Sequence, residues 1–119
     1  MKLIYVASPY AGNIEKNTEY AKQACRSVME QGHAFFAPHL LYPSLLDETN
    51  PAQRQLGIDM GLTMLSRCDE LWAFGERISA GMESEICEAK RLGIPVQYTE
   101  IAEKKSMAVT EATSFSMVL

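Results

Sequence analysis

The chain has 119 residues, of which 47% are hydrophobic and 22% are charged, and its formal net charge is −4. This composition is typical of one globular domain with a single core, and no apolar run approaches the roughly 20 residues that span a bilayer. The acidic balance and the lack of a basic cluster argue against binding of duplex DNA or RNA, whereas a single nucleotide needs only a few donors for its phosphate.

The N-terminal residues and the cysteines favour a reducing, cytoplasmic location. Residues 1–7 carry one positive charge and a short apolar stretch, whereas a secretory signal has a longer apolar core and a small-residue cleavage site. The three cysteines, Cys25, Cys68 and Cys87, form neither a C-x-x-C pair nor a zinc spacing. We therefore expect free thiols, with Cys25 and Cys68 in the core.

The first third of the chain predicts strand, helix and strand. Residues 2–7 are apolar after the initial lysine, which is typical of a central strand in a parallel sheet. A loop follows, Asn13 caps a helix with a regular apolar stripe, and Gly32 ends it. Residues 33–37 form a short second strand. Residues 38–51 then lose all periodicity, so we expect a long loop, either functional or a surface excursion.

The remaining elements complete an α/β fold. We predict a helix over 52–67, a strand with a glycine turn over 68–75, a helix over 79–92 and a strand over 94–98. The order implies a three-layer, Rossmann- or flavodoxin-like fold with a small parallel sheet of four to five strands. Residues 1–101 form the domain, and 102–119 form a tail that is a last short strand, an arm onto a neighbouring subunit, or loose.

Ligands of such sheets bind at the carboxyl ends of the strands. That edge contains Ser8, Pro9 and Tyr10, the loop after residue 38, and residues 75–81. His39 can also reach this edge, although a loop histidine without a role is the simpler interpretation. His33 begins its strand at the far edge, and the two histidines form no metal-binding pattern.

Glu85 lies in the apolar stripe of the helix over 79–92, three residues after Met82 and four before Ala89. A carboxylate on a packing face costs several kcal/mol unless it is paired or opens onto a cavity. Glu85 is therefore a candidate catalytic residue; the alternative is a glutamate at the margin of the stripe that pairs with a neighbouring lysine or arginine.

Asp59 is a second candidate for a buried acid, in the helix over 52–67. Gly57 and Gly61 flank it, and glycines there suit the close approach of a ligand or another backbone. A polar residue on a surface face is the alternative.

At the start of the next helix, Ser79 and Gly81 leave free N–H groups that suit a phosphate, although serine is also a common N-cap.

These motifs resemble the nucleoside 2-deoxyribosyltransferases and the related nucleotide N-hydrolases over residues 3–98. The resemblance rests on the strand end Tyr5-Val6-Ala7-Ser8-Pro9-Tyr10, on Asp59 ten residues before Asp69, and on Ser79-x-Gly81-x-x-x-Glu85 followed by Gly93-Ile94-Pro95-Val96. The S-x-G-x-x-x-E form looks like the branch that hydrolyses 2′-deoxynucleoside 5′-monophosphates. The transferase branch tends to have an acid in place of Ser79.

The resemblance implies cleavage of an N-glycosidic bond in a (deoxy)nucleoside 5′-monophosphate by double displacement. Glu85 would be the nucleophile, kept ionised by the helix N-terminus, and Tyr5 would orient it by a hydrogen bond. Asp59 would hold the sugar hydroxyls, and Ser79 and Gly81, with the first loop at Ser8, Pro9 and Tyr10, would bind the substrate. No metal or organic cofactor is required.

The alternatives are a deoxyribosyltransferase and a nucleotide-binding module without turnover. The first loop has Pro9-Tyr10 where the hydrolases commonly carry an arginine for the phosphate, which favours the module. A flavodoxin-like flavin protein lacks an evident phosphate loop after the first strand.

We also expect a homo-oligomer whose site a neighbour completes. The helix over 52–67 is apolar along two lines, one through Leu56, Met60 and Met64 and one through Ile58, Leu62 and Leu65. One line can face the sheet, and the other needs a second partner or the loop over 38–51.

Overall fold

The computed structural model describes residues 1–101, so the segment 102–119, for which we predicted a tail, lies outside the described residues. Four parallel strands form one sheet in the order β2-β1-β3-β4. The elements are β1 (Leu3–Ala7), α1 (Ile14–Glu30), β2 (Ala34–Phe36), α2 (Pro38–Leu41), η1 (Tyr42–Ser44), α3 (Pro51–Leu65), β3 (Glu70–Phe74), α4 (Ala80–Arg91) and β4 (Val96–Thr99). The predicted α/β fold with a small parallel sheet is confirmed.

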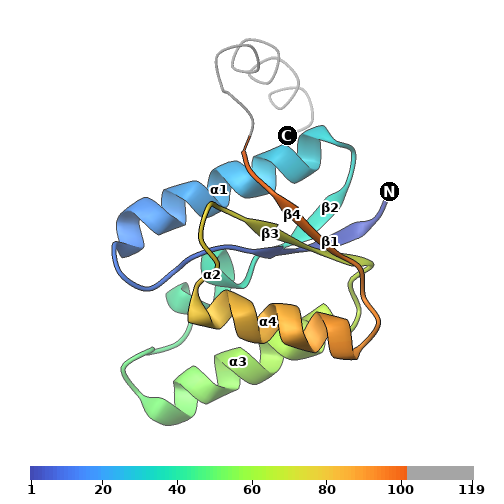
Figure 1. The fold of residues 1–119 in the computed structure, drawn as a ribbon. Coiled ribbons are helices and arrows are strands. Elements are labelled where there is room, and N and C mark those ends of the chain that lie inside the picture. The colour runs from blue at the N-terminus through green and yellow to red at the C-terminus, as the bar shows by residue number, and fades with distance from the viewer. Residues whose placement is uncertain (102–119) are drawn as a thin grey trace.

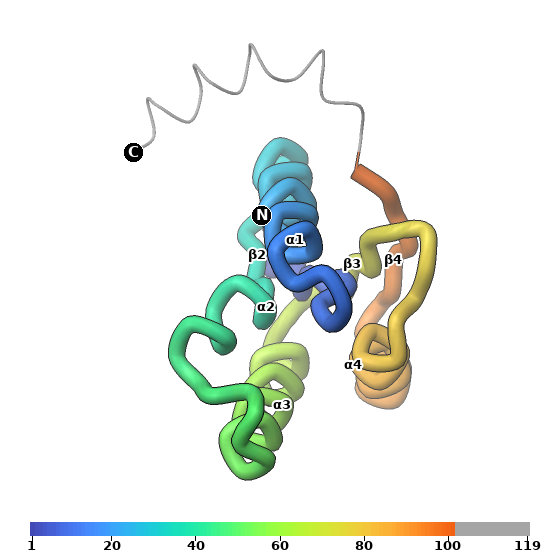
Figure 2. The backbone as a smooth tube through the Cα atoms, turned by 90° about the vertical axis from the view of Figure 1, so that its left-hand side faces the viewer, coloured from blue at the N-terminus to red at the C-terminus, as the bar shows by residue number. Residues whose placement is uncertain are grey.

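The sheet lies between two layers of helices (Figure 1). Side chains alternate across the central strands, so Ile4 and Val6 of β1 pack with α1, whereas Tyr5 and Ala7 pack with α3 and α4. Figure 2, which is turned by 90°, shows α1 on one side of the sheet and α3 with α4 on the other. None of the helices in residues 1–101 combines the length and the apolar character that a membrane span requires.

The ends of α1 follow the predicted capping signals. The Asn13 side chain accepts a hydrogen bond from the backbone N–H of Lys16 at 3.1 Å. Gly32 follows the helix with φ +86°, a left-handed conformation that glycine adopts without steric cost. The helix between them spans 17 residues.

Residues 38–51 differ from the predicted irregular loop, because they contain the helical turn α2 and the 3₁₀ turn η1. Pro38 and Pro43 stand at the first positions of these turns, where their missing N–H groups are not needed. The segment then packs on α3, where Leu46 lies near Gly57. The prolines therefore begin short helices here instead of preventing them.

At the amino edge of the sheet, polar side chains tie β1 to β3. The Lys2 Nζ lies 2.5 Å from Glu70 Oε2, and the Trp72 indole N–H donates to Glu70 Oε1 at 2.8 Å. The backbone N–H of Leu3 donates to Asp69 Oδ2 at 2.7 Å. The Lys2 ammonium lowers the pKa of Glu70 by hydrogen bonding, so the carboxylate stays charged. These contacts fix the register at the edge opposite the predicted ligand site.

Candidate active site

The loops that follow β1 and β3 meet at the carboxyl edge of the sheet. Gly75, directly after β3, has φ +119°, and a Cβ built on it would lie 3.9 Å from Pro9 Cδ. The chain then turns into α4, whose N-cap is Ser79. The start of α4 is thereby placed beside the end of β1, as the sequence predicted.

Glu85 lies in the second turn of α4, on the face that packs against the sheet. Its neighbours in the stripe, Met82, Ile86 and Ala89, are buried. The Tyr5 hydroxyl donates a hydrogen bond to Glu85 Oε2 at 2.5 Å. The other oxygen, Oε1, is buried and has no hydrogen-bond partner among the described residues. One carboxylate oxygen is thus held by Tyr5, and the other lacks a hydrogen-bond partner among the described residues.

Burial raises the pKa of Glu85 to about 7, and the hydrogen bond from Tyr5 opposes this shift. We expected the start of α4 to favour the ionised carboxylate; the pKa is instead raised, because burial disfavours the charged form. The pKa of Tyr5 is also raised, first by burial and then by the charge of Glu85. Tyr5 therefore remains a protonated donor over the physiological pH range.

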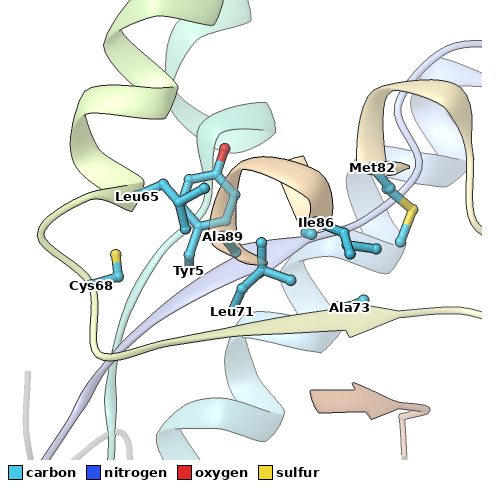
Figure 3. Close-up of a cluster of buried hydrophobic side chains, with 9 residues drawn as sticks. Tyr5, Leu65, Cys68, Leu71, Ala73, Met82, Ile86 and Ala89 are labelled. Atoms are coloured by element: carbon cyan, nitrogen blue, oxygen red, sulfur yellow. The ribbon is translucent and has the colours of Figure 1, made fainter. Parts of the chain in front are cut away.

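Tyr5 stands in an aromatic and glycine-lined environment that the sequence analysis did not identify. Figure 3 shows its ring rising from β1 next to Leu65, with the hydroxyl pointing away from the sheet. The Tyr5 ring lies 5.7 Å from that of Phe36, which lies 5.9 Å from that of Tyr42. A Cβ built on Gly61 would lie 3.4 Å from the Tyr5 hydroxyl oxygen. Two glycines four residues apart were the signal for this arrangement.

Asp59 is exposed, so the expectation of a buried acid at this position is wrong. It accepts a hydrogen bond from Gln55 Nε2 at 2.9 Å, one turn earlier on α3. The stripe of α3 that enters the core runs through Gly61 and Leu65, and Asp59 lies off that stripe. Gly57 and Gly61 make room for Leu46 and Tyr5. Of the predicted residues, Tyr5 and Glu85 share a hydrogen bond, whereas Asp59 bonds to Gln55.

Ser79 and Gly81 lie at the start of α4. The Ser79 hydroxyl accepts a hydrogen bond from the backbone N–H of Met82 at 3.2 Å, which is an N-cap contact. Gly81 is exposed, and a Cβ built on it would meet no atom within 4 Å. The first turn of α4 therefore has open space beside it.

The first loop is held partly by His39. Ser8 is buried, and the ring of Tyr10 stacks on that of His39 with centroids 4.8 Å apart and planes inclined by 22°. Burial lowers the pKa of His39, although a hydrogen bond with the Ser8 backbone opposes the shift. His39 is thus at the carboxyl edge with Tyr10. His33 is at the amino edge, where its Nδ1 accepts from the backbone N–H of Lys2 at 3.2 Å.

Two hollows of the surface lie away from Glu85. One follows the outer face of α4 between Ala80 and Arg91, and the other follows α1 between Asn13 and Gln23. Within residues 1–101, no three His, Cys, Asp or Glu side chains gather as a metal site would require. The candidate site is thus defined by the Tyr5–Glu85 pair and the adjoining edge of the sheet.

The α/β architecture is shared with several solved structures. A 2-deoxyribosyltransferase from Bacillus psychrosaccharolyticus is similar in structure with a TM-score of 0.65 and 21% identity, over 82% of this chain and 72% of that one. A CMP N-glycosidase, BcmB, from Clostridium botulinum matches with a TM-score of 0.53 and 20% identity, over 89% and 74%. A conserved protein from Enterococcus faecalis V583 matches with a TM-score of 0.55 and 25% identity, over 82% and 62%.

The chain belongs to the protein family described as domain of unknown function DUF7768, whose profile matches residues 2–99. The comparison with curated proteins gave no match. Family membership therefore covers the whole described domain without naming an activity, and the similarity to the two enzymes establishes the fold.

Proposed function

We propose that this protein cleaves the N-glycosidic bond of a (deoxy)nucleoside 5′-monophosphate through a covalent glycosyl intermediate on Glu85. One observation carries the proposal: a buried carboxylate whose Oε2 accepts from Tyr5 while its Oε1 has no partner among the described residues. Burial of an unpaired carboxylate oxygen is costly, and functional sites are where proteins retain such a cost. The likeness in fold to a 2-deoxyribosyltransferase and a CMP N-glycosidase supports the substrate class.

In the proposed mechanism, Glu85 Oε1 attacks the anomeric carbon of the sugar. The C1′–O bond forms as the C1′–N bond breaks, and the electron pair of that bond leaves with the base, which takes up a proton. Water then attacks the same carbon, returns the carboxylate and releases the sugar phosphate. Both steps pass through an oxocarbenium-like transition state, so a nearby carboxylate favours them electrostatically.

The raised pKa of Glu85 determines when this chemistry proceeds. The carboxylate must be ionised to attack, and with a pKa of about 7 it is protonated at acidic pH. Turnover should therefore rise with pH around 7 on the acid limb of the profile. The hydrogen bond from Tyr5 lowers the pKa of Glu85 and so favours the reactive form.

The first turn of α4 is the proposed binding site for the 5′-phosphate. Its exposed Gly81 and its N-cap Ser79 leave backbone N–H groups accessible at the positive end of the helix dipole. Ser8, Pro9 and Tyr10 are the proposed substrate contacts from the end of β1, where Pro9 lies near Gly75 in the loop that leads to α4. Asp59 remains a proposed contact for the sugar hydroxyls; Gln55 donates to its Oδ1, so substrate would bind at its Oδ2.

The proposal is tested by incubating the protein with matched sets of nucleosides, 2′-deoxynucleosides and their 5′-monophosphates, and by measuring free base chromatographically. Release of base from monophosphates is expected in the parent protein and not in Glu85→Gln. Glu83→Gln is the matched control, because Glu83 lies in the same helix and is exposed. Lack of base release from every substrate in the panel would contradict the proposal.

A transferase activity is the second candidate, because one of the similar structures is a 2-deoxyribosyltransferase. Adding a free acceptor base to the same reaction distinguishes the two. A transferase forms a new nucleoside with the added base, whereas a hydrolase releases sugar phosphate at an unchanged rate. Nucleotide binding without either product would instead support a binding module.

We also infer that the protein forms a homo-oligomer through the surface around α3. Four leucine and isoleucine side chains there are strongly exposed: Leu41 by 42%, Leu45 by 69%, Leu56 by 47% and Ile58 by 46%. The segment over 38–51 packs at Gly57 but leaves these side chains uncovered. Sedimentation should show more than one chain per particle, and Ile58→Asp should lower that number, whereas Ile14→Asp on α1 should not. A parent protein that sediments as a single chain would contradict this inference.

A further inference from the structure

Helix α3 carries two glycines, Gly57 and Gly61, in its interior. Glycine in a helix interior costs about 1 kcal/mol relative to alanine. The two positions are four residues apart and so share one face of the helix. What occupies the space beside each glycine therefore indicates why the helix tolerates both.

The two spaces are used differently. A Cβ built on Gly57 would lie 3.2 Å from Leu46 Cδ1 and 3.9 Å from Tyr42 Cβ, so this glycine receives an apolar side chain. A Cβ built on Gly61 would lie 3.4 Å from the hydroxyl oxygen of Tyr5. That hydroxyl is the donor to Glu85 Oε2.

Tyr5 has little freedom to move away from a larger residue at position 61. It lies in the central strand β1, its ring contacts that of Phe36, and only 1% of the residue is exposed. A methyl group at position 61 would be in van der Waals contact with the hydroxyl oxygen, and further side-chain atoms would compete for its position. The Tyr5–Glu85 hydrogen bond thus depends on α3 having no side chain larger than a methyl group there.

We propose that Gly61 is a positioning residue, which keeps open the space where the Tyr5 hydroxyl meets the Glu85 carboxylate. The catalytic meaning of this role rests on the proposed function; the geometric role does not. A larger residue at position 61 should loosen the hydrogen bond, and this bond is what favours ionisation of Glu85. The observable consequence is a higher titration midpoint for Glu85.

Few titratable groups surround this hydrogen bond. Tyr5 faces Glu85 from β1. The charges of Tyr42 from η1 and Cys68 from the turn before β3 raise the pKa of Tyr5. Burial and the bond with Tyr5 account for the shift at Glu85 itself. A change in its midpoint therefore reports on burial or on the hydroxyl of Tyr5.

The test is a carbon-detected NMR titration of protein labelled at the glutamate carboxyl carbons, with the Glu85 signal assigned by its loss in Glu85→Gln. Gly61→Val should raise the Glu85 midpoint by about half a pH unit or more. In a Tyr5→Phe background the same change should have no further effect, because no hydroxyl remains to be displaced. Gly57→Val is the matched control and should leave the midpoint unchanged.

If Gly61→Val does not fold alone, Gly61→Cys completes the same cycle, since its Sγ extends beyond a methyl group that would lie at ordinary contact distance. A midpoint that equals the parent value in the folded Gly61 variant overturns the proposal. So does a rise of equal size with and without the Tyr5 hydroxyl. The titration uses no substrate, so its result is independent of whether nucleotides are cleaved.

Discussion

The two faces of the sheet are built from different kinds of residue. The core toward α1 is formed by apolar side chains, with Ile4, Val6, Trp72 and Phe74 from the strands packed on Ala24, Cys25 and Val28 from the helix. The face toward α3 and α4 has small residues at Ala7, Ala73 and Ala89, and it contains the buried Tyr5–Glu85 pair. The buried Tyr5–Glu85 hydrogen bond thus lies on the face toward α3 and α4.

The features that lower stability lie on the face toward α3 and α4. On the α1 side, a single helix of 17 residues covers the strands without interruption. On the other side, α3 has glycines in its interior, and burial raises the pKa of a carboxyl group on α4. Both features lower the stability of a domain. Proteins retain such features where a function requires them. Changes on the two faces should therefore affect activity and stability separately.

The largest expected effect is on Glu85. Glu85→Gln preserves shape and removes the nucleophile, so turnover should fall roughly thousandfold, which corresponds to about 4 kcal/mol of barrier. By contrast, the free energy of unfolding of Glu85→Gln should exceed that of the parent at neutral pH. The folded carboxyl holds its proton up to a pKa of about 7, compared with an ordinary value of 4.5. The parent should therefore lose stability relative to Glu85→Gln as pH rises from 4.5 to 7.

Base-release assays check the predicted loss of turnover in Glu85→Gln. Denaturant unfolding at several pH values checks the predicted pH dependence of its stability relative to the parent. Glu83→Gln on the exposed side of α4 should match the parent in each measurement. An active Glu85→Gln protein would contradict the proposed nucleophile, and a parallel pH dependence of parent and variant would contradict the raised pKa.

A smaller effect is expected at the start of α4. Ser79→Ala removes the N-cap and should lower the free energy of unfolding by about 1 kcal/mol. It should also weaken binding of a nucleoside monophosphate roughly tenfold, a loss of about 1.4 kcal/mol, while leaving nucleoside binding nearly unchanged. Calorimetric titration of Glu85→Gln measures both ligands without turnover. Ser84→Ala, exposed on the same helix, is the control. Equal weakening for both ligands would exclude a phosphate contact.

A weaker and pH-dependent effect is expected at Tyr5. Tyr5→Phe removes the hydrogen bond that lowers the pKa of Glu85, so the acid limb of the pH–rate profile should move to higher pH. A displacement of about one unit would reduce turnover roughly fivefold at pH 7 and much less at pH 9. A loss that is the same at both pH values would show that the hydroxyl acts in some other way.

The smallest effect on turnover is expected on the α1 face. Ile4→Val removes one buried methyl group and should cost about 1 kcal/mol of stability. Because Ile4 faces α1, turnover per folded molecule should equal that of the parent. A loss of turnover that exceeds the loss of folded protein would contradict the prediction that changes on the α1 face affect stability and not activity.

The sequence was sufficient to predict the order of strands and helices, the capping of α1 and the place of Glu85. These features depend on local signals, namely continuous apolar runs, an Asn cap and a stripe of period 3.6, which the chain carries without contradiction. Glu85 was identifiable because a charge inside such a stripe is exceptional. The bond from Tyr5 was also anticipated, and the structure shows it.

Other features could not be predicted, because they depend on which side chains approach across elements. Asp59 appeared to be buried from its glycine neighbours, yet those glycines accommodate Leu46 and Tyr5. The pKa of Glu85 depends on total desolvation, which no spacing rule measures. The turns α2 and η1 were missed because residues 38–51 lack the apolar periodicity from which the longer helices were predicted.

The tryptophan on the α1 face has a practical consequence. The chain has one tryptophan, Trp72, which is 4% exposed and donates to Glu70 at the amino edge of the sheet. Its fluorescence should report the integrity of the sheet from the face opposite Glu85, and its emission should shift to longer wavelength when the sheet opens to water. Unfolding can therefore be followed optically in every variant described above, with no label near the site and no signal from the reaction.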